Sequence, residues 1–214
     1  MKSDRLARCV RATLGRLVPL LFRTRIIGAE RVPAGGALLA GNHVSYLDPV
    51  LLWCVSPRPV HFMAKSELFV KGFVAWLLPR LWGFPVNRGE PDRTAIVTAT
   101  EILQSGGLVG VFPEGSRREA DAGEAVGEAH GGAAFIALRA GVPIVPVAIL
   151  GTERAMPRGA SLPRLVKVTI VVGEPIDPGT VAPEAGRKER VALVTARMME
   201  EISALLASDP GGAR

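Results

Sequence analysis

Short apolar runs alternate along the chain with segments in which apolar residues recur at helical spacing. The apolar runs predict strands at residues 26–32, 37–40, 60–64, 84–87, 108–112, 142–150 and 166–172. Helical spacing predicts helices from Asp48 onward and over residues 67–82, 92–104, 133–140 and 184–206. Strands that alternate with helices are typical of an α/β protein, so we expect a mostly parallel or mixed sheet covered by helices on both faces.

Residues 25–207 contain all of the predicted strands. A chain of 214 residues favours one domain, so we assign this whole range to a single domain. Within it, residues 116–132 are rich in Glu, Ala and Gly without clear periodicity, which predicts a mobile loop. Residues 208–214 are expected to form a disordered tail.

Residues 1–24 form a separate segment with the pattern of a basic amphipathic helix. One face would carry Leu6, Val10, Leu14, Leu17 and Leu21, and the other Arg5, Arg8, Arg11, Arg16 and Arg23. Pro19 is expected to kink or end the helix, because proline lacks the backbone donor that a helix interior needs. Such a helix either lies on a membrane surface or packs on the core with its arginines in water; we favour the membrane surface.

Positive charge is concentrated at the start of the chain. The formal net charge is +6, and residues 1–25 hold seven Lys and Arg against one Asp, so the remainder is neutral overall. This distribution predicts an anionic partner. Aromatic residues do not alternate with cations in the body of the chain, so we expect an anionic membrane or a phosphorylated substrate and no nucleic acid.

The cysteines and histidines are few and scattered. Cys9 and Cys54 have no partner at the spacing of a metal site or a disulfide framework, which agrees with a reducing compartment. We expect no metal site and interpret His61 as structural. The chain has neither a signal-peptide pattern nor an uncharged run of about 18 residues. The basic amphipathic helix suits an anionic cytoplasmic leaflet, so we expect peripheral or monotopic attachment at the cytoplasmic face of the cell membrane.

His43 and Asp48 are the first candidates for chemistry. His43 follows a predicted buried strand, and Asp48 stands five residues later at a helix start, so both belong to the edge of the sheet where α/β sites form. A neutral imidazole can take a proton from an alcohol while a carboxylate fixes its tautomer. A Gly-x-Ser-x-Gly elbow is absent, which favours direct transfer. The spacing equally fits a helix N-cap and a hydrogen-bonded loop residue.

A second group of charged residues follows three of the predicted strands. Glu114, Arg117 and Arg118 lie in the turn after one strand, and Arg88 and Lys65 follow two others. Arginine binds phosphate through paired hydrogen bonds, so these four cations predict a phosphate site at one edge of the sheet. Taken singly, each is equally a surface charge, and Glu114 an ion-pair partner.

Four blocks of sequence stand in order between residues 25 and 175. They read Asn-His-Val-Ser-Tyr-Leu-Asp at 42–48, Gly-Phe-Pro-Val-Asn-Arg at 83–88, Phe-Pro-Glu-Gly-Ser-Arg at 112–117 and Val-Pro-Ile-Val-Pro-Val at 142–147. Together they resemble the motifs of the bacterial lysophosphatidate (1-acylglycerol-3-phosphate) acyltransferases of the glycerolipid acyltransferase superfamily. Asn87 stands where that family commonly has an acidic residue, and Ser116 where it frequently has Thr.

The resemblance implies a role for each block. His43 would be the general base and Asp48 its partner. The acceptor-binding group would be Lys65, Arg88, Glu114, Gly115, Ser116 and Arg117. The apolar fourth block would be a core strand that also contributes to the acyl side. Family members often carry Lys-x-Gly before the next helix, where this chain has His130 and two glycines, so the acceptor specificity stays open.

The resemblance also implies the reaction. A fatty acyl group would move from acyl-CoA or acyl-carrier protein, as co-substrate, to the sn-2 hydroxyl of 1-acylglycerol-3-phosphate, giving phosphatidic acid without a cofactor. The partners would be a lysophospholipid acceptor, the acyl donor and an anionic membrane surface. Two alternatives remain: the same chemistry with glycerol-3-phosphate or a lyso-aminolipid as acceptor, and a non-catalytic lipid-binding protein.

Overall fold

The computed structural model describes residues 5–70, 72–87, 92–115, 129–157, 160 and 162–208. At the start of the first helix it describes the backbone of residues 5–8 and 11 without their side chains. The predicted loop at 116–132 and the predicted tail at 208–214 fall mainly outside these ranges.

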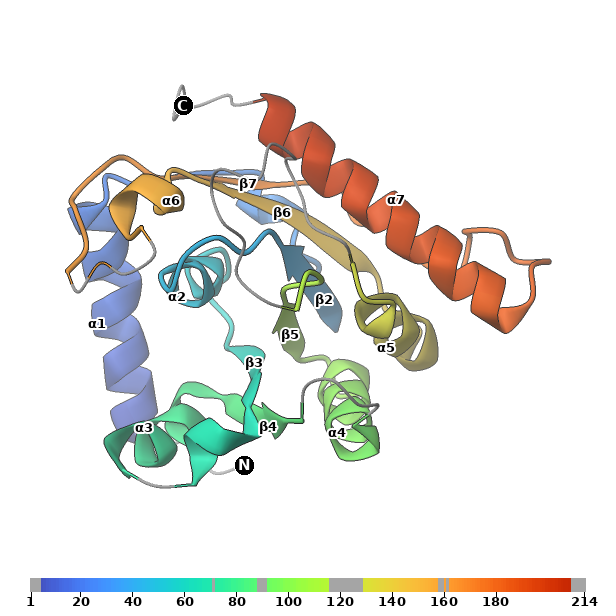
Figure 1. Cartoon of the computed structure of the whole chain (residues 1–214), viewed down its shortest axis with the longest axis horizontal. Helices are drawn as coiled ribbons and strands as arrows, with labels where there is room; N and C mark the ends of the chain where they lie inside the picture. Colours follow the sequence, from blue (N-terminus) through green and yellow to red (C-terminus); the bar gives the residue numbers. More distant parts are fainter. Residues whose placement is uncertain are drawn as a thin grey trace.

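A mixed sheet forms the centre of the described chain (Figure 1). Its seven strands are, in spatial order, β1 (Arg25–Ile27), β7 (Thr169–Val172), β6 (Ile144–Leu150), β2 (Ala37–Gly41), β5 (Leu108–Val111), β3 (Val60–Lys65) and β4 (Gly83–Val86). Strands β6, β2, β5, β3 and β4 are mutually parallel, whereas β7 pairs antiparallel with β6 and carries β1 parallel to itself. The carboxyl ends of five strands therefore share one edge.

Helices cover both faces of this sheet. On one face, Leu38 and Ala40 of β2 belong to a core shared with α4 (Arg93–Gln104), α5 (Gly132–Ala140) and α7 (Arg187–Ser208). On the other, Ala37 and Leu39 belong to a core shared with α1 (Arg5–Leu21) and α2 (Asp48–Trp53). Successive strand residues point to opposite faces, so β2 is buried on both sides. The predicted α/β fold, a mixed sheet between two helical layers, is confirmed.

The helix predicted over residues 67–82 is wrong in its continuity. The segment instead forms η2 (Ser66–Phe69), α3 (Gly72–Leu77) and η3 (Leu78–Leu81). Gly72 has φ of +89°, outside helical geometry, and Pro79 lies in the first turn of η3, where the chain changes from α-helix to 3₁₀-helix. Trp82 ends it in the left-handed region, with φ of +59°. The apolar content of this segment therefore predicted one continuous helix where the chain forms three short helical pieces.

Other element boundaries also differ from the prediction. The strand predicted at 26–32 ends at Ile27, because Gly28 turns the chain with φ of +79° into η1 (Ala29–Arg31). A short helix that the sequence pattern did not predict, α6 (Thr152–Ala155), follows β6. These differences leave the order of the strands unaffected.

Helix α1 packs on the core along only part of its apolar surface. It continues through Pro19 and ends at Leu21, two residues beyond the proline that was expected to kink or end it. Leu14 and Val18 pack on the core that contains Phe22. Leu17, Leu20 and Leu21 remain exposed, Leu20 by 74%. The apolar positions of the helix are therefore divided between a stripe that packs on the core and a stripe that faces solvent.

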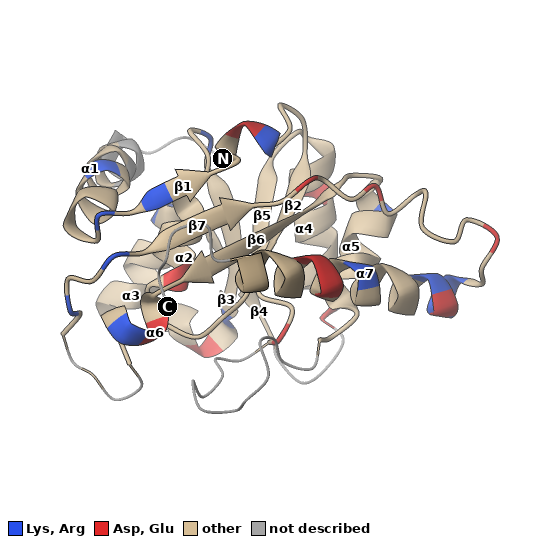
Figure 2. Ribbon diagram, turned by 90° about the horizontal axis from the view of Figure 1, so that it is seen from above, with Lys and Arg blue, Asp and Glu red and all other residues tan. Residues whose placement is uncertain are grey.

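Charged residues are distributed unevenly over the described chain. Figure 2 shows basic residues on the described part of α1 and at β1, whereas α7 carries charges of both signs. None of the helices in the described ranges is long and apolar enough to cross a membrane.

Candidate active site

Asn42 fixes the point at which the chain leaves β2. Its Nδ2 donates to the carbonyl of Ile149 at 3.0 Å, and its Oδ1 accepts from the amide of Ile149 at 2.7 Å. The side-chain amide thereby continues the pairing of β2 with β6 one step beyond the register of Gly41 with Val147. The residue that follows, His43, consequently starts from a fixed position at the carboxyl edge of the sheet.

His43 and Asp48 meet at this edge. The Nδ1 atom of His43 lies 2.9 Å from Oδ2 of Asp48, whose carboxylate is fully buried. The same oxygen accepts from the amides of Val44 at 2.8 Å and Ser45 at 2.7 Å. A carboxylate oxygen has no proton to donate, so this oxygen also accepts the hydrogen bond from Nδ1. The ring proton therefore sits on Nδ1, and the lone pair of Nε2 is left for a substrate.

The N-cap interpretation of Asp48 is corrected by the structure. Asp48 is the first residue of α2, Leu47 precedes it as the cap, and the Leu47 side chain makes no capping hydrogen bond. The Asp48 carboxylate turns back toward residues 43–45 instead of onto the helix amides. Its second oxygen, Oδ1, is buried and has no hydrogen-bond partner among the described residues. The carboxylate therefore holds the turn at residues 43–45 together and makes no capping hydrogen bond to α2.

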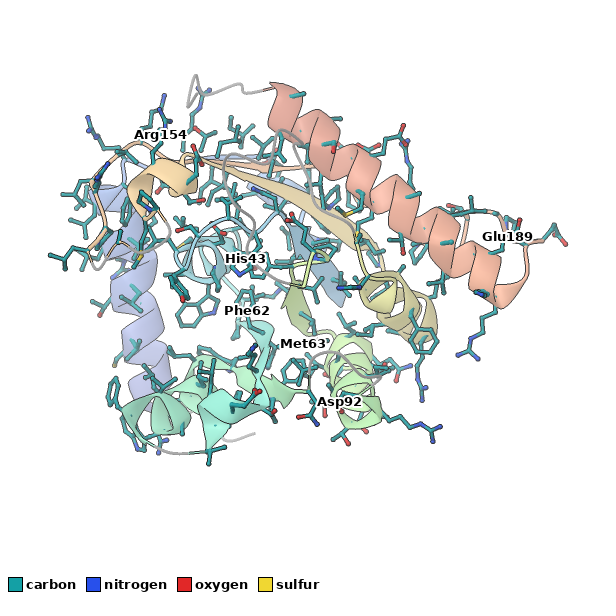
Figure 3. All side chains as sticks on the ribbon, viewed as in Figure 1. His43, Phe62, Met63, Asp92, Arg154 and Glu189 are labelled. Atoms are coloured by element: carbon teal, nitrogen blue, oxygen red, sulfur yellow. The ribbon has the colours of Figure 1, made fainter. Side chains whose placement is uncertain are left out.

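The ring of His43 stacks on Phe112, a contact that the sequence analysis did not anticipate. The two ring centroids are 4.2 Å apart and the planes differ by 20°. Phe62 lies behind Phe112 at 6.4 Å, also in a stacked orientation. Figure 3 shows His43 and Phe62 close together in the middle of the molecule. A Cβ at Gly110 would overlap the Phe62 ring, so the glycine leaves room for the stack.

Glu114 and Gly115 occupy the turn that follows β5. Glu114 is buried, and its Oε1 accepts from the amide of His43 at 3.4 Å. Gly115 has φ of +68°, and a Cβ there would lie 2.9 Å from the ring of His130. The amide of Gly115 donates to the carbonyl of Phe112 at 3.0 Å. The backbone amides of residues 43–45 thus donate to the carboxylates of Glu114 and Asp48, and the amide of Gly115 closes its own turn.

The remaining predicted binding residues belong to neighbouring strand ends. Lys65 is exposed at the end of β3, opposite Val86 of β4. Arg88 follows β4 but, like Ser116 and Arg117, lies outside the described residues. The structure therefore brings the strand ends that carry these residues to the edge where His43 lies.

Asp92 closes the connection that contains Arg88. One carboxylate oxygen accepts from the amide of Ala95 and the other from the amide of Asn87, each at 2.9 Å. The bond from Ala95 and then that from Asn87 lower the pKa of the Asp92 carboxyl below its ordinary value, because both donors favour the charged form. The sequence predicted a helix start here. The second bond, back to the end of β4, required the structure.

His61 lies on β3 and makes a structural contact. Its Nδ1 donates to the carbonyl of Leu108 at 3.1 Å, and burial lowers the pKa of His61 below its ordinary value by disfavouring the charged ring. Its interpretation as a structural residue agrees with this geometry. Over the described ranges, no three His, Cys, Asp or Glu side chains are grouped as ligands for a metal ion.

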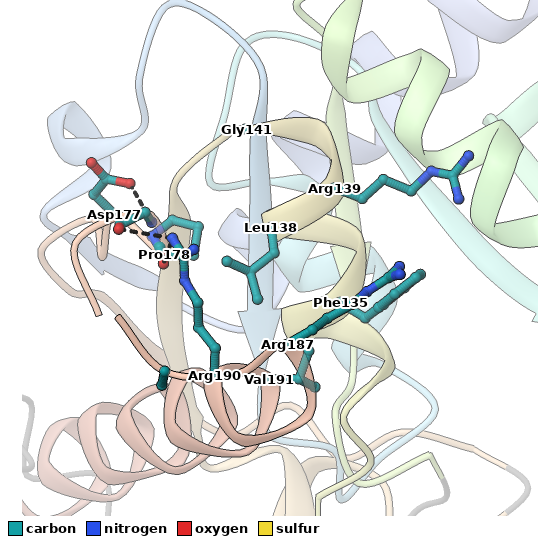
Figure 4. A pocket seen from close by; sticks show the side chains of 11 residues that line it. Phe135, Leu138, Arg139, Gly141, Asp177, Pro178, Arg187, Arg190 and Val191 are labelled. Carbon is teal, nitrogen blue, oxygen red and sulfur yellow. Dashed lines mark hydrogen bonds between the residues drawn. The ribbon is translucent and has the colours of Figure 1, made fainter. Parts of the chain in front are cut away.

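A pocket of about 410 Å³ lies between α5, α7 and the chain at 177–179 (Figure 4). Gly141, which lines it, precedes β6, so the pocket is at the edge where the parallel strands begin, opposite to His43. Arg190 donates there to the carbonyls of Pro178 and Gly179, and Arg187 lies over the ring of Phe135. These arginines tie the loop and helices together, and none of the candidate site residues lines the pocket.

The fold and the edge geometry define an α/β protein in which a histidine at the carboxyl edge of the sheet is bound to a buried carboxylate. The chain belongs to the acyltransferase family: the family model described as "Acyltransferase" matches residues 23–150. A 1-acyl-sn-glycerol-3-phosphate acyltransferase from Bacillus subtilis is 31% identical over 183 residues, covering 85% of this chain and 87% of the relative. The chain is therefore an acyltransferase of that family, and family membership implies a lysophospholipid acceptor and an acyl donor.

Two further comparisons extend this result. The crystal structure of the 1-acyl-sn-glycerophosphate acyltransferase PlsC from Thermotoga maritima superposes with a TM-score of 0.72 at 27% identity, covering 97% of this chain and 84% of that chain. A lyso-ornithine lipid O-acyltransferase from Pseudomonas aeruginosa is 33% identical over 144 residues, covering 66% of this chain and 53% of the relative. Relatives of this chain thus carry names with different acceptors.

The stacking of Phe112 predicts that it positions the His43 ring. Phe112→Leu is expected to lower kcat about tenfold with little change in KM, because the imidazole loses the contact that fixes its plane. Phe112→Tyr keeps an aromatic ring and is expected to retain most of the rate. Steady-state kinetics, with thermal unfolding as a check on folding, measure both. A Leu variant with unchanged kcat would show that the hydrogen bond to Asp48 alone orients the ring.

Proposed function

We propose that this acyltransferase moves a fatty acyl group from acyl-CoA or acyl-carrier protein to the sn-2 hydroxyl of 1-acylglycerol-3-phosphate. The observation that carries the proposal is the orientation of His43, whose Nδ1 is bound by a buried carboxylate while Nε2 remains as the base. The name of the Bacillus subtilis relative supports the choice of acceptor.

In the proposed reaction His43 acts first as a base and then as an acid. Its Nε2 takes the proton of the acceptor hydroxyl as that oxygen attacks the thioester carbonyl. The new C–O ester bond forms, the C–S bond breaks, and the imidazolium returns its proton to the leaving thiolate. The Asp48 charge stabilises the imidazolium between these steps. General-base assistance of this kind contributes roughly 10²- to 10⁴-fold, and positioning of the two substrates supplies much of the rest.

Replacement of the pair tests this mechanism. His43→Ala is expected to abolish turnover, because no other base replaces Nε2. Asp48→Asn keeps an acceptor for the amides of Val44 and Ser45 but removes the charge, so kcat is expected to fall about 10²- to 10⁴-fold. Thiol release from acyl-CoA measures the rate, and thermal unfolding shows whether each variant is folded. Normal turnover by a folded His43→Ala protein would rule the mechanism out.

The proposed acceptor site uses cations from several strand ends. Lys65, Arg88 and Arg117 would hold the phosphate of the acceptor, with Glu114, Gly115 and Ser116 shaping the turn beside it. The second candidate acceptor is a lyso-aminolipid, which the name of the Pseudomonas aeruginosa relative favours. A phosphate-free headgroup would not need a cationic edge.

An acceptor panel separates the two possibilities. We expect the wild-type protein to acylate 1-acylglycerol-3-phosphate in preference to glycerol-3-phosphate and a lyso-aminolipid, with product mass as the readout and both donors tested. Arg117→Ala is expected to raise KM for the phosphate acceptor about tenfold or more and to change kcat little, because the arginine binds the headgroup throughout the reaction. Arg139→Ala, on α5 at the opposite edge of the sheet, is the matched control. Preference for the aminolipid would reverse the assignment.

We further propose that the protein attaches peripherally to the cytoplasmic face of the membrane through α1. The exposed stripe of Leu17, Leu20 and Leu21 adjoins the most basic part of the sequence, a combination suited to an anionic leaflet. The stripe that packs on the core would keep the helix attached to the domain.

Substitution of the exposed leucines of α1 tests this attachment. Replacing Leu17, Leu20 and Leu21 together by Ser is expected to reduce flotation with acidic vesicles by at least about tenfold, because the apolar area that enters the lipid is lost. These side chains are exposed, so the fold should survive, unlike in a deletion that removes Leu14 and Val18. Leu193→Ser on α7 serves as the control for removing an exposed leucine. Undiminished flotation of the triple variant would count against the role of α1.

A further inference from the structure

A second group of exposed apolar side chains lies on η2 and α3. We define the α3 patch by its residues Leu68, Val70, Phe73, Val74 and Trp76. Phe73 is 70% exposed and Val70 69%, and none of the described residues of η2, α3 and η3 is buried. Single exposed apolar residues need no explanation, but five within nine positions are typical of a surface that another body covers.

The aromatic residues of the α3 patch are ordered although they are exposed. Phe73 and Trp76 stack with their ring centroids 5.7 Å apart. The guanidinium of Arg80 lies 4.2 Å from the centroid of the Trp76 ring, and its Nη1 donates to the Trp76 carbonyl at 2.6 Å. A cation is thus held against the aromatic pair. Aromatic rings flanked by a cation suit a boundary between an apolar and an aqueous phase.

The place of the α3 patch in the fold connects it with the active site. The patch begins three residues after Lys65, the last residue of β3, and β3 ends at the same edge of the sheet as the strand that leads to His43. Helix α1 packs against η3, and Figure 1 shows the lower end of α1 beside α3. The end of α1 beside α3 is its N-terminal end, whereas Leu17, Leu20 and Leu21 lie toward its other end, so the two groups of exposed apolar side chains occupy separate points along α1.

We propose that the α3 patch is a second membrane contact, which docks on an anionic lipid leaflet and turns the catalytic edge toward it. This inference rests on the proposed function only in that the acceptor is taken to come from the bilayer. The charges around the patch favour such a partner. Residues 65–82 hold Lys65, Lys71 and Arg80 against Glu67, and residues 1–25 carry the charge excess of the whole chain.

The chemistry of the α3 patch distinguishes a bilayer from other occupants. An acidic carrier protein would be recognised mainly by a cluster of cations, whereas this surface is apolar with cations at its margin. A second copy of the chain would bring the same basic charge and would be repelled. With α1 and α3 both in the leaflet, the domain would be held at two points, which restricts its orientation more than one helix can.

Full-length protein with Phe73→Ser and Trp76→Ser tests the proposal. Flotation with vesicles of phosphatidylglycerol and phosphatidylcholine is expected to weaken at least about tenfold, because two aromatic side chains no longer enter the interface. Acylation of a long-chain acceptor embedded in those vesicles should fall in parallel. Acylation of a short-chain acceptor dissolved as monomers should stay unchanged, since the patch does not touch the reacting atoms.

Controls separate this proposal from its rivals. Phe73→Ser alone, at the most exposed position, provides a second variant should the double variant unfold, and Val97→Ser on α4 matches the loss of an exposed apolar side chain elsewhere. Unchanged flotation of folded variants would overturn the proposal. So would a loss confined to acyl-carrier protein as donor, or a change in the oligomeric state in solution. Failure of the wild-type protein to acylate either acceptor would contradict the proposed function and leave the flotation result intact.

Discussion

One oxygen of the buried Asp48 carboxylate organises the reactive part of this protein. It accepts hydrogen bonds from Nδ1 of His43 and from the amides of Val44 and Ser45. A buried charge without donors costs several kcal/mol, so the turn retains the conformation that supplies them. The same three bonds to this oxygen orient the imidazole and assign its proton to Nδ1. The conformation of the turn and the orientation of His43 thus depend on one carboxylate oxygen.

The sheet provides the fixed positions that this interaction needs. Asn42 joins the end of β2 to β6 through both atoms of its amide, while Phe112, just beyond β5, supports the other face of the His43 ring. Glu114 accepts from the His43 amide from the same neighbouring strand end. Residues that follow β2 and β5 therefore converge on one histidine, as the carboxyl edge of a parallel sheet allows.

The apolar side chains of α1 are divided between the core and the surface, and α3 carries exposed ones. Val18 of α1 packs on the core while Leu20 is exposed, and the exposed Phe73 and Trp76 follow β3 close to the catalytic edge. In the proposed function, a lipid substrate travels from the bilayer to His43. Exposed apolar side chains beside the edge that holds the base would shorten that path, which gives the distribution of these residues a physical reason.

The sequence by itself determined the alternation of strands and helices, the His43–Asp48 pair and the family, because periodicity and ordered motifs are local properties of the chain. It did not determine that Asp48 faces back to residues 43–45, that Phe112 stacks on His43, or that residues 67–82 break into three pieces. The Phe112 contact joins residues far apart in the chain, the Asp48 contact needs the exact conformation of the turn, and the three pieces depend on backbone angles at Gly72 and Trp82. Only the packed tertiary structure brings such groups within reach of one another.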